Sequence, residues 1–208
     1  MSEQAGRPGR RELNAQRRRL IAEAAAECFI EKGFHQTSIR DIARKAGVSL
    51  GNLYNHFDSK HALIAEIAAL EADELDSVEM ALNASDQPDL ALKQFAEAYL
   101  DLASQPEIAV LTAEIAAEAM RNAEISSLFN TNRARLAKSV EMVLSKGVDC
   151  GRFDAGLEPG ETAWQILDLL DGVAMRMAFS KKNAAHQSRR SAVNLIDRVV
   201  SRLLESRC

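Results

Sequence analysis

The sequence predicts an all-α protein. Alanine and leucine are abundant while aromatic residues make up only 5% of the chain, a balance that favours helix over strand. Apolar residues recur at helical spacing along most of the chain, and no alternating strand pattern appears. With 208 residues and 47% hydrophobic content, the chain can form one large domain or two small ones. We expect about nine helices, divided between a small N-terminal head of three helices and a larger C-terminal body.

The chain is expected to open with a flexible basic arm over residues 1–13, because this stretch has glycines, a proline and no apolar period. The first helix then runs from about Asn14 to Lys32, and Gly33 is a plausible C-cap. Five arginines cluster in and after the arm. These are Arg10, Arg11, Arg17, Arg18 and Arg19. They indicate either an arm that contacts phosphate or the minor groove, or a tail that keeps the protein soluble.

Two short helices around a turn at Gly47 complete the head, which spans residues 14–60. The first of them begins at Thr37 or Ser38, both good N-cap residues, and ends at Gly47. The second is capped by Ser49 and is expected to run to about Phe57. Such a pair is a helix-turn-helix, whose second helix can lie in the major groove of DNA.

The body is expected over residues 61–208, as further helices separated by short loops. The apolar spacing and the positions of proline and glycine predict helices over Lys60–Asn83, Leu90–Ser104, Glu107–Arg121, Ile125–Lys146 (ending near Gly147), Pro159–Ser180 and Ser188–Glu205.

Charge is divided unevenly along the chain. Residues 1–60 carry a balance of +4, and the remainder carries −8. A basic head on an acidic body suits phosphate binding at one end, even though the whole chain is acidic. No apolar run is long enough to cross a bilayer and no signal peptide is evident, so we expect a cytoplasmic protein with no membrane partner.

The three cysteines are too few and too widely spaced for a disulfide framework. Cys28 falls on an apolar helical face and is expected to be a small core residue. Cys150 lies in a loop, where it is either an oxidant sensor or an inert exposed thiol.

The head carries a long, ungapped motif. It consists of Thr37, Ile42-Ala43, Ala46-Gly47-Val48-Ser49, Gly51, Tyr54, His56-Phe57 and Lys60. This motif resembles the signature of the TetR (tetracycline-repressor-like) family of bacterial transcription regulators, over about residues 14–65. The body resembles the family only in length, helix order and features such as Leu170-Asp171-Gly172. The resemblance implies an all-helical homodimer, usually a repressor, that binds a palindromic double-stranded DNA operator and is released by a small-molecule effector.

The residue types at the motif suit contacts with DNA. Gly51 lets the backbone come close, Leu50 suits a thymine methyl group, and Asn52 offers both donors and acceptors to base edges or phosphate. Tyr54 and Lys60 resemble the family's phosphate-contacting positions, although Tyr54 alternatively packs within the head. His56 resembles them too, or is a surface residue bonded to the backbone. The predicted DNA-binding set is Thr37, Ser38, Ser49, Leu50, Gly51, Asn52, Tyr54, Asn55, His56 and Lys60.

An effector pocket follows from the resemblance alone, and its candidate lining is Phe95, Tyr99, Met120, Phe129 and Trp164. Aromatic and methionine residues at helical spacing are more often core. Glu114 and Glu118 share a helical face; facing inward they would favour a cation, but a solvated outward face is the ordinary expectation. Candidate dimer contacts, which alternatively fill the subunit's own core, are Val173, Met177, Ile196, Val200 and Leu203.

Two rival functions are weaker. The sequence does not indicate an enzyme. No catalytic or metal-ligand spacing occurs, and no glycine-rich phosphate loop appears. The four histidines are scattered along the chain: His35, His56, His61 and His186. We therefore expect no catalytic residue, no cofactor and no metal site. The second rival is a helical adaptor that binds protein through the head. The identities of the operator, the effector and the regulated genes do not follow from the sequence.

Overall fold

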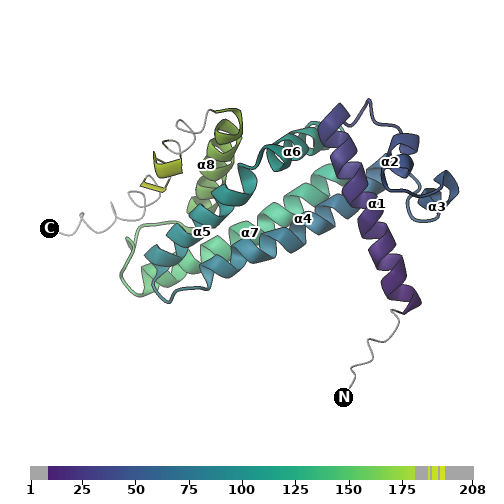
Figure 1. Ribbon diagram of the computed structural model, residues 1–208. Helices are drawn as coiled ribbons and strands as arrows, with labels where there is room; N and C mark the ends of the chain where they lie inside the picture. The colour runs from purple at the N-terminus through teal and green to yellow at the C-terminus, as the bar shows by residue number, and fades with distance from the viewer. Residues whose placement is uncertain (1–8, 181–186, 188, 192, 195–208) are drawn as a thin grey trace, which may run out of the picture. The chain divides into compact units, whose positions relative to one another are not determined.

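The computed structural model describes residues 9–180, 187, 189–191 and 193–194, and all regular structure in them is helical. This confirms the all-α fold class. The predicted ninth helix, residues 188–205, lies mostly outside the described residues. The eight described helices are α1 (Arg10–Lys32), α2 (Ile39–Lys45), α3 (Leu50–Tyr54), α4 (Lys60–Leu82), α5 (Pro88–Ala103), α6 (Pro106–Ala119), α7 (Ala123–Asp149) and α8 (Pro159–Phe179) (Figure 1).

The helices form two compact units. The head unit comprises Met1–Glu71 and Glu114–Leu128, and the body unit comprises Ala72–Ala113 and Phe129–Cys208. Helices α4, α6 and α7 therefore each contribute residues to both units. The sequence-based boundary at residue 60 separated head from body along the chain. The structure instead groups the first part of α4, and a segment from the second half of the chain, with the head.

The head unit has a small core of its own. The apolar stripe of α1 is buried, and it includes Ile21, Cys28 and Phe29. Ile42 of α2 and Leu53 of α3 are also fully buried. Cys28 is thus the core residue that its helical face predicted, and burial raises the pKa of its thiol. The short helices α2 and α3 depend on this packing, since helices of this length are marginal alone.

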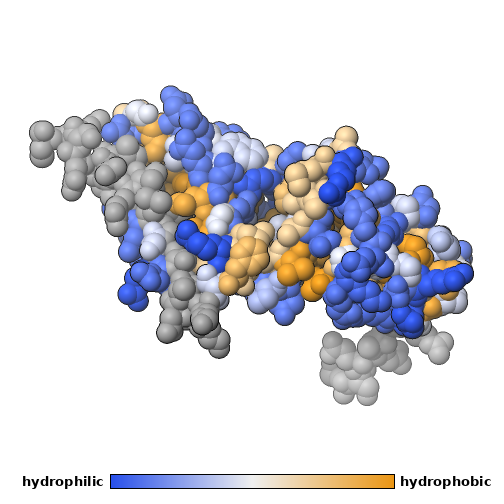
Figure 2. All heavy atoms as spheres, turned by 90° about the horizontal axis from the view of Figure 1, so that it is seen from above, coloured by the Kyte–Doolittle hydropathy of each residue, from blue (hydrophilic) through white to orange (hydrophobic). Residues whose placement is uncertain are grey.

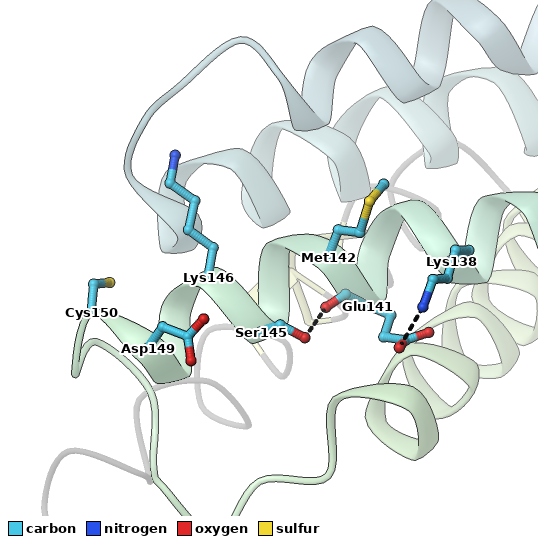
Figure 3. Close-up of a pocket in the computed structure, with 7 residues that line it drawn as sticks. All are labelled: Lys138, Glu141, Met142, Ser145, Lys146, Asp149 and Cys150. Atoms are coloured by element: carbon cyan, nitrogen blue, oxygen red, sulfur yellow. Dashed lines mark hydrogen bonds and ion pairs between the residues drawn. The ribbon is translucent and has the colours of Figure 1, made fainter.

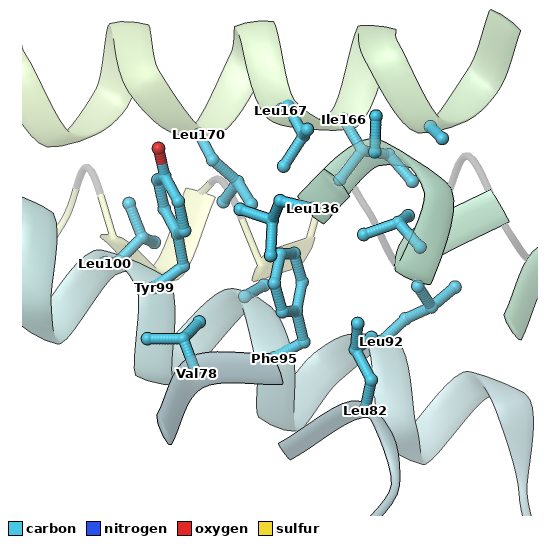
Figure 4. Packing of buried hydrophobic residues seen from close by; sticks show 14 of the residues in the cluster. Val78, Leu82, Leu92, Phe95, Tyr99, Leu100, Leu136, Ile166, Leu167 and Leu170 are labelled. Atoms are coloured by element: carbon cyan, nitrogen blue, oxygen red, sulfur yellow. The ribbon is translucent and has the colours of Figure 1, made fainter. Parts of the chain in front are cut away.

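The body unit contains a larger core, built from α4, α5, α7 and α8 (Figure 4). Val78 and Leu82 of α4 belong to it, together with Phe95 of α5, Leu136 of α7 and Leu167 of α8. These residues repeat at three- and four-residue spacing on their helices, so each helix turns one apolar stripe inward.

Helix α7 ends at Asp149, close to the predicted end near Gly147, and Gly147 itself lies in its last turn. The ring of Phe153 packs directly on the glycine, and a Cβ atom there would lie 2.0 Å from the Phe153 ring. The amides of Arg152 and Phe153 both donate to the carbonyl of Gly147, at 2.8 and 3.0 Å. The glycine therefore admits the returning chain, and the helix continues to Asp149.

Hydrophilic residues predominate on the face seen in Figure 2, with small groups of apolar residues between them. Among residues that the structure describes, no helix has both the length and the apolar character needed to cross a membrane.

Candidate nucleic-acid interface

The N-terminus of α2 is fixed by a reciprocal cap. The Ser38 hydroxyl oxygen accepts a hydrogen bond from the Asp41 amide at 3.1 Å, and the Asp41 carboxylate accepts one from the Ser38 amide at 3.1 Å. Hydrogen bonds from Ser38 and then from Lys32 hold the pKa of Asp41 well below its usual range. Ser38 lies at the exposed start of the helix, as its place in the predicted DNA-binding set requires.

The turn between α2 and α3 has a defined geometry. Gly47 adopts a φ of 63°, a left-handed conformation that favours glycine. Its amide donates to the Arg44 carbonyl at 3.2 Å, and the Val48 amide donates to the Ala43 carbonyl at 3.0 Å. These two bonds make a Schellman motif, which satisfies the last carbonyls of α2 and redirects the chain into α3.

Helix α3 is shorter than predicted, because it ends at Tyr54 rather than near Phe57. Ser49 caps it, accepting a hydrogen bond from the Asn52 amide at 3.1 Å. After Tyr54 the amides of His56 and Phe57 both bond to the Leu53 carbonyl, which tightens the chain into a turn. Leu53 and Phe57 are buried, so one side of the segment is held in the head core.

The opposite side of α3 faces solvent. Tyr54 is 52% exposed, which excludes its packing wholly within the head, and Gly51 and Asn55 are exposed as well. A Cβ atom on Gly51 would meet nothing within 4 Å in the described part of the chain, so packing against those residues does not require the glycine. Leu50 is half-buried. Asn52 is also half-buried, and its Oδ1 is shielded and accepts no hydrogen bond within the described chain, so its amide must rotate outward to reach a base.

Thr37 does not belong to the exposed set. It is 2% exposed, and its hydroxyl lies in hydrogen-bonding distance of two carbonyl oxygens, that of Gly33 at 2.8 Å and that of Cys28 at 3.0 Å. Its prediction as a DNA contact is therefore corrected: Thr37 ties the loop before α2 to the end of α1. Threonine at a helix start is equally suited to either role, which is why the sequence did not separate them.

Lys60 and His56 have internal contacts as well. The Lys60 ammonium donates to the carbonyls of Phe34 at 2.7 Å and Thr37 at 3.0 Å, and lies 4.3 Å from the centre of the Phe34 ring. Burial lowers the pKa of Lys60, and the charge of Glu118 offsets part of that effect. His56 is half-buried, and its carbonyl accepts a hydrogen bond from Arg18 at 2.8 Å.

The arginines of the predicted arm divide into two groups. Helix α1 already begins at Arg10, so the arm is shorter than residues 1–13. Arg18 is structural: it pairs with Glu66 and lies 4.4 Å from the centre of the Phe57 ring. Arg10, Arg11 and Arg17 are exposed on the helix, and Arg19 pairs with Glu23. The sequence analysis did not identify Arg40, which is exposed on the first turn of α2 and adds a cation to that short helix.

The geometry is that of a helix-turn-helix with its second helix open on one side. The profile of "Bacterial regulatory proteins, tetR family" matches residues 21–67, and that of "BetI-type transcriptional repressor, C-terminal" matches residues 88–205. The chain is a TetR-family transcriptional regulator. Members of this family are DNA-binding regulators rather than enzymes.

Individual proteins agree with the TetR-family assignment. The transcriptional regulator UidR of Escherichia coli K12 is 29% identical over 163 residues, covering 75% of this chain and 79% of UidR. A TetR-family regulator from Mesorhizobium loti is 25% identical in its crystal structure, with a TM-score of 0.73 over 91% of this chain and 97% of that one. A transcriptional regulator from Saccharomonospora viridis in complex with choline shares the fold at 22% identity, with a TM-score of 0.77 over 88% and 96%.

Residues predicted for the TetR effector pocket lie in different environments. Phe95 is fully buried in the body core, and Tyr99 packs beside it with ring centroids 5.9 Å apart. Trp164 is 41% exposed and Phe129 is half-buried. Met120 is 82% exposed and belongs to the head unit, so its assignment to the pocket is wrong. It lies just beyond the end of α6, where helical periodicity no longer predicts its direction.

A polar network beside these aromatic residues was missed. Tyr99 donates to the Asp171 carboxylate, Arg133 pairs with both Asp171 and Asp168, and the Arg133 guanidinium lies 5.8 Å from the centre of the Trp164 ring. Burial raises the pKa of Asp171, and the bonds from Tyr99 and Arg133 offset part of this. The sequence does contain one indication of this network. Arg133 is a cation three residues before Leu136, so it falls on the same face of α7 as the apolar stripe.

Two of the four histidines are close together, which the sequence did not show. His35 Nε2 lies 2.9 Å from one Glu118 carboxylate oxygen, and His61 Nε2 lies 4.0 Å from the other. Glu118 is only 5% exposed, so the expectation of an outward, solvated carboxylate is wrong. Within the described ranges, no group of three or more histidine, cysteine or acidic side chains is arranged to hold a metal ion.

The predicted dimer contacts are only partly described. Val173 is 4% exposed and belongs to the subunit's own core, so it is corrected from interface to core residue. Met177 is half-buried against the same core. The other three, Ile196, Val200 and Leu203, lie outside the described residues.

Cys150 is exposed at the end of α7 (Figure 3). Its thiol lies 3.5 Å from the Gly147 carbonyl and borders a surface hollow of about 470 Å³ that also contains Lys146 and Asp149. Its role as an oxidant sensor stays a prediction.

Proposed function

We propose that the chain is a repressor. Its homodimer binds a palindromic double-stranded DNA operator and is released when a small-molecule effector binds the body. The observation that carries the DNA-binding part is the two-sidedness of α3: Leu53 is fixed in the head core, while Gly51, Tyr54 and Asn55 face outward. Residues 14–60 are then the DNA-binding domain and residues 61–208 the effector and dimerisation domain. The site of action is the bacterial cytoplasm, where the operator lies.

Each exposed polar group has a proposed task at the operator. Leu50, Gly51 and Asn52 approach base edges, and Asn55 contacts a base or phosphate. Tyr54 and His56 contact phosphates and set the register. Lys60 has three donors, of which two are committed to carbonyls, so the third is assigned to phosphate. Ser38 and Ser49 add contacts where the amides opening α2 and α3 favour an anion.

Binding to duplex DNA tests this assignment. A duplex selected by the wild-type chain from a randomised pool should bind with an affinity that falls steeply with salt, because counterions are released from the phosphates. Tyr54→Phe should weaken binding to specific and scrambled duplexes alike, whereas Asn52→Ala should change sequence preference. Equal affinity for every variant, measured by fluorescence anisotropy, would contradict the assignment. Absence of any salt-dependent DNA binding would favour the protein adaptor.

The homodimer is supported by Gly172 in α8. This glycine is exposed in the interior of a 21-residue helix, and a Cβ atom there would meet nothing within 4 Å among the residues that the structure describes. A glycine in a helix is less stable than alanine by about 1 kcal/mol, so its presence fits the close approach of a second copy. We expect Gly172→Ala to raise the melting temperature of the subunit and to weaken dimerisation. Analytical ultracentrifugation of both proteins measures this, and a monomeric wild type would exclude the dimer.

The effector region is proposed around Phe95, Tyr99, Phe129 and Trp164, with Arg133 and Asp171 as polar partners. The structure from Saccharomonospora viridis, which holds choline, supports a small-molecule effector for this chain. Trp164 is the single tryptophan of the chain, so its fluorescence reports binding at the network directly. Choline is the first probe for titration. Any compound that changes Trp164 fluorescence should also lower affinity for the selected duplex, because coupling between two sites is reciprocal. Independent binding of compound and duplex would refute release by an effector.

A further inference from the structure

The loop between α1 and α2, residues 33–37, connects directly to the cap of α2. Gly33 begins it with a φ of 81°, and its amide donates to the Phe29 carbonyl at 2.8 Å. Thr37 ends it with a buried hydroxyl bonded to the Gly33 carbonyl. Because α2 starts at the next cap, Ser38, the position of this loop sets where α2 begins.

Glu114 of α6 holds the beginning of the loop. Its carboxylate accepts a hydrogen bond from the Phe34 amide at 2.8 Å and lies 3.5 Å from the point where a Cβ atom on Gly33 would be. The Phe34 amide is therefore satisfied by a side chain 80 residues further along the sequence. A backbone donor bonded to a carboxylate is a strong, directional contact.

Glu118, one turn further along α6, contacts the same loop. Its buried carboxylate pairs with His35 of the loop at 2.9 Å and with Arg121 at 3.3 Å. Lys60, whose ammonium bonds the loop carbonyls of Phe34 and Thr37, feels the Glu118 charge as well. A buried carboxylate requires cationic partners, which Arg121 and Lys60 supply, so these groups stabilise one arrangement together.

These contacts surround a hollow of about 530 Å³ in the head unit, lined by Phe34, His35, Ser59, Lys60, His61, Glu118, Arg121 and Asn122. Both carboxylates already bond the loop or its neighbours, and the described donors are not arranged for a metal. Their chemistry therefore points to the loop itself as their partner.

We propose that Glu114 and Glu118 are positioning residues for DNA binding: they fix the α1–α2 loop and thereby hold α2 and α3 in the arrangement that binds the operator. This inference rests on the DNA-binding function, but on no particular operator or effector. Without the carboxylates the loop samples several positions, and the apparent affinity falls in proportion to the fraction of molecules that remains competent.

Electrostatics and positioning predict opposite signs for Glu118→Gln. Removing a negative charge from a DNA-binding protein should strengthen binding through the phosphates alone. Glutamine keeps an oxygen acceptor for His35 but removes the charge that Arg121 and Lys60 share, so positioning predicts roughly tenfold weaker binding if about one molecule in ten keeps the competent arrangement. Glu107→Gln is the matched control, because Glu107 is exposed on the same helix and loses the same charge. It should bind as the wild type does, or slightly more tightly.

Glu114 supplies a second, graded test. Glutamine retains an oxygen acceptor for the Phe34 amide, so Glu114→Gln should keep wild-type affinity within about twofold, whereas Glu114→Ala should weaken binding roughly tenfold. Hydrogen–deuterium exchange of the Phe34 amide should accelerate in Glu114→Ala and not in Glu107→Gln. These variants keep the inference testable if Glu118→Gln does not fold.

The measurements use the full chain, well below its melting temperature, with a duplex that the wild type selects from a randomised pool. Weaker binding by Glu118→Gln and Glu114→Ala with an unchanged salt slope supports positioning, since the phosphate contacts themselves are intact. Binding by both variants within twofold of wild type overturns it. So does zinc-dependent affinity of the wild type that Glu118→Gln abolishes, because the cluster would then be a metal site. If the wild type selects no duplex, the proposed function fails first.

Discussion

The head and body units both bury an apolar core, but they place their polar side chains differently. In the head, Ser38 and Ser49 cap short helices at the surface, and Tyr54 faces solvent. In the body, Tyr99 and Arg133 meet Asp171 between three helices, beside a packed core. The helix-turn-helix of the head therefore keeps polar side chains at its surface, whereas these polar side chains of the body bond to one another beside the core. The following changes probe that difference, beginning with the largest expected effect.

Phe95→Ala tests whether the body centre is core or pocket. Phe95 is fully buried, so the deletion should lower the free energy of unfolding by about 3–5 kcal/mol. Urea denaturation followed by circular dichroism measures the loss. A loss well under 1 kcal/mol would instead indicate that Phe95 lines a space that is normally open to effector.

Gly147→Ala tests the tightest contact in the body. The new methyl group would overlap the Phe153 ring, so we expect a loss of about 1–3 kcal/mol as the ring and its loop move. Wild type is the reference for this comparison. A Gly147→Ala variant with the melting temperature of wild type would contradict the packing of Phe153 on α7.

Gly51→Ala separates stability from DNA binding in the head. A Cβ atom on Gly51 meets open space, so alanine should stabilise α3 by about 0.5–1 kcal/mol. The same methyl group lies on the face assigned to DNA and should weaken duplex binding roughly tenfold, a loss of about 1.4 kcal/mol. Thermal unfolding and anisotropy, measured on the same preparation, should therefore change in opposite directions. A variant that is more stable and binds equally well would remove Gly51 from the interface.

Ser38→Ala tests the cap of α2 and its dependence on pH. Loss of the cap should lower stability by about 1 kcal/mol at neutral pH. The folded-state pKa of Asp41 lies below its ordinary 3.8, chiefly through Ser38, so this contribution is complete above that pH and is lost as the pH falls further. The difference in melting temperature between wild type and Ser38→Ala should thus shrink on acidification below pH 3.8. A difference that grows in acid would contradict the reciprocal cap.

Much of the head was predictable because local rules decide it. Gly47 is required by the left-handed turn and Ser49 by the cap of α3, and both signals lie within a few residues of the feature they produce. The burial of Leu53 and Phe57 likewise follows from their four-residue spacing.

Tertiary partners decided what the sequence did not. Thr37 and Lys60 carry the right chemistry for DNA, but the structure commits the Thr37 hydroxyl, and two Lys60 donors, to the α1–α2 loop. Glu118 has the pattern of a solvated residue and is buried because His35 and Arg121 meet it. Gly147 resembles a helix end, and only the position of Phe153 shows that a side chain at residue 147 would be blocked. Periodicity identifies a face, but it does not identify what that face meets.

The segment Glu114–Leu128 gives the head a discontinuous boundary. Ile115 and Ile125 in this segment are buried, and Glu114 satisfies a backbone amide of the α1–α2 loop. A fragment cut after Glu71 would lack those side chains, although it contains the whole helix-turn-helix. A hybrid protein that joins this head unit to the C-terminal domain of another regulator therefore has to include both Met1–Glu71 and Glu114–Leu128. A single junction in the sequence does not suffice.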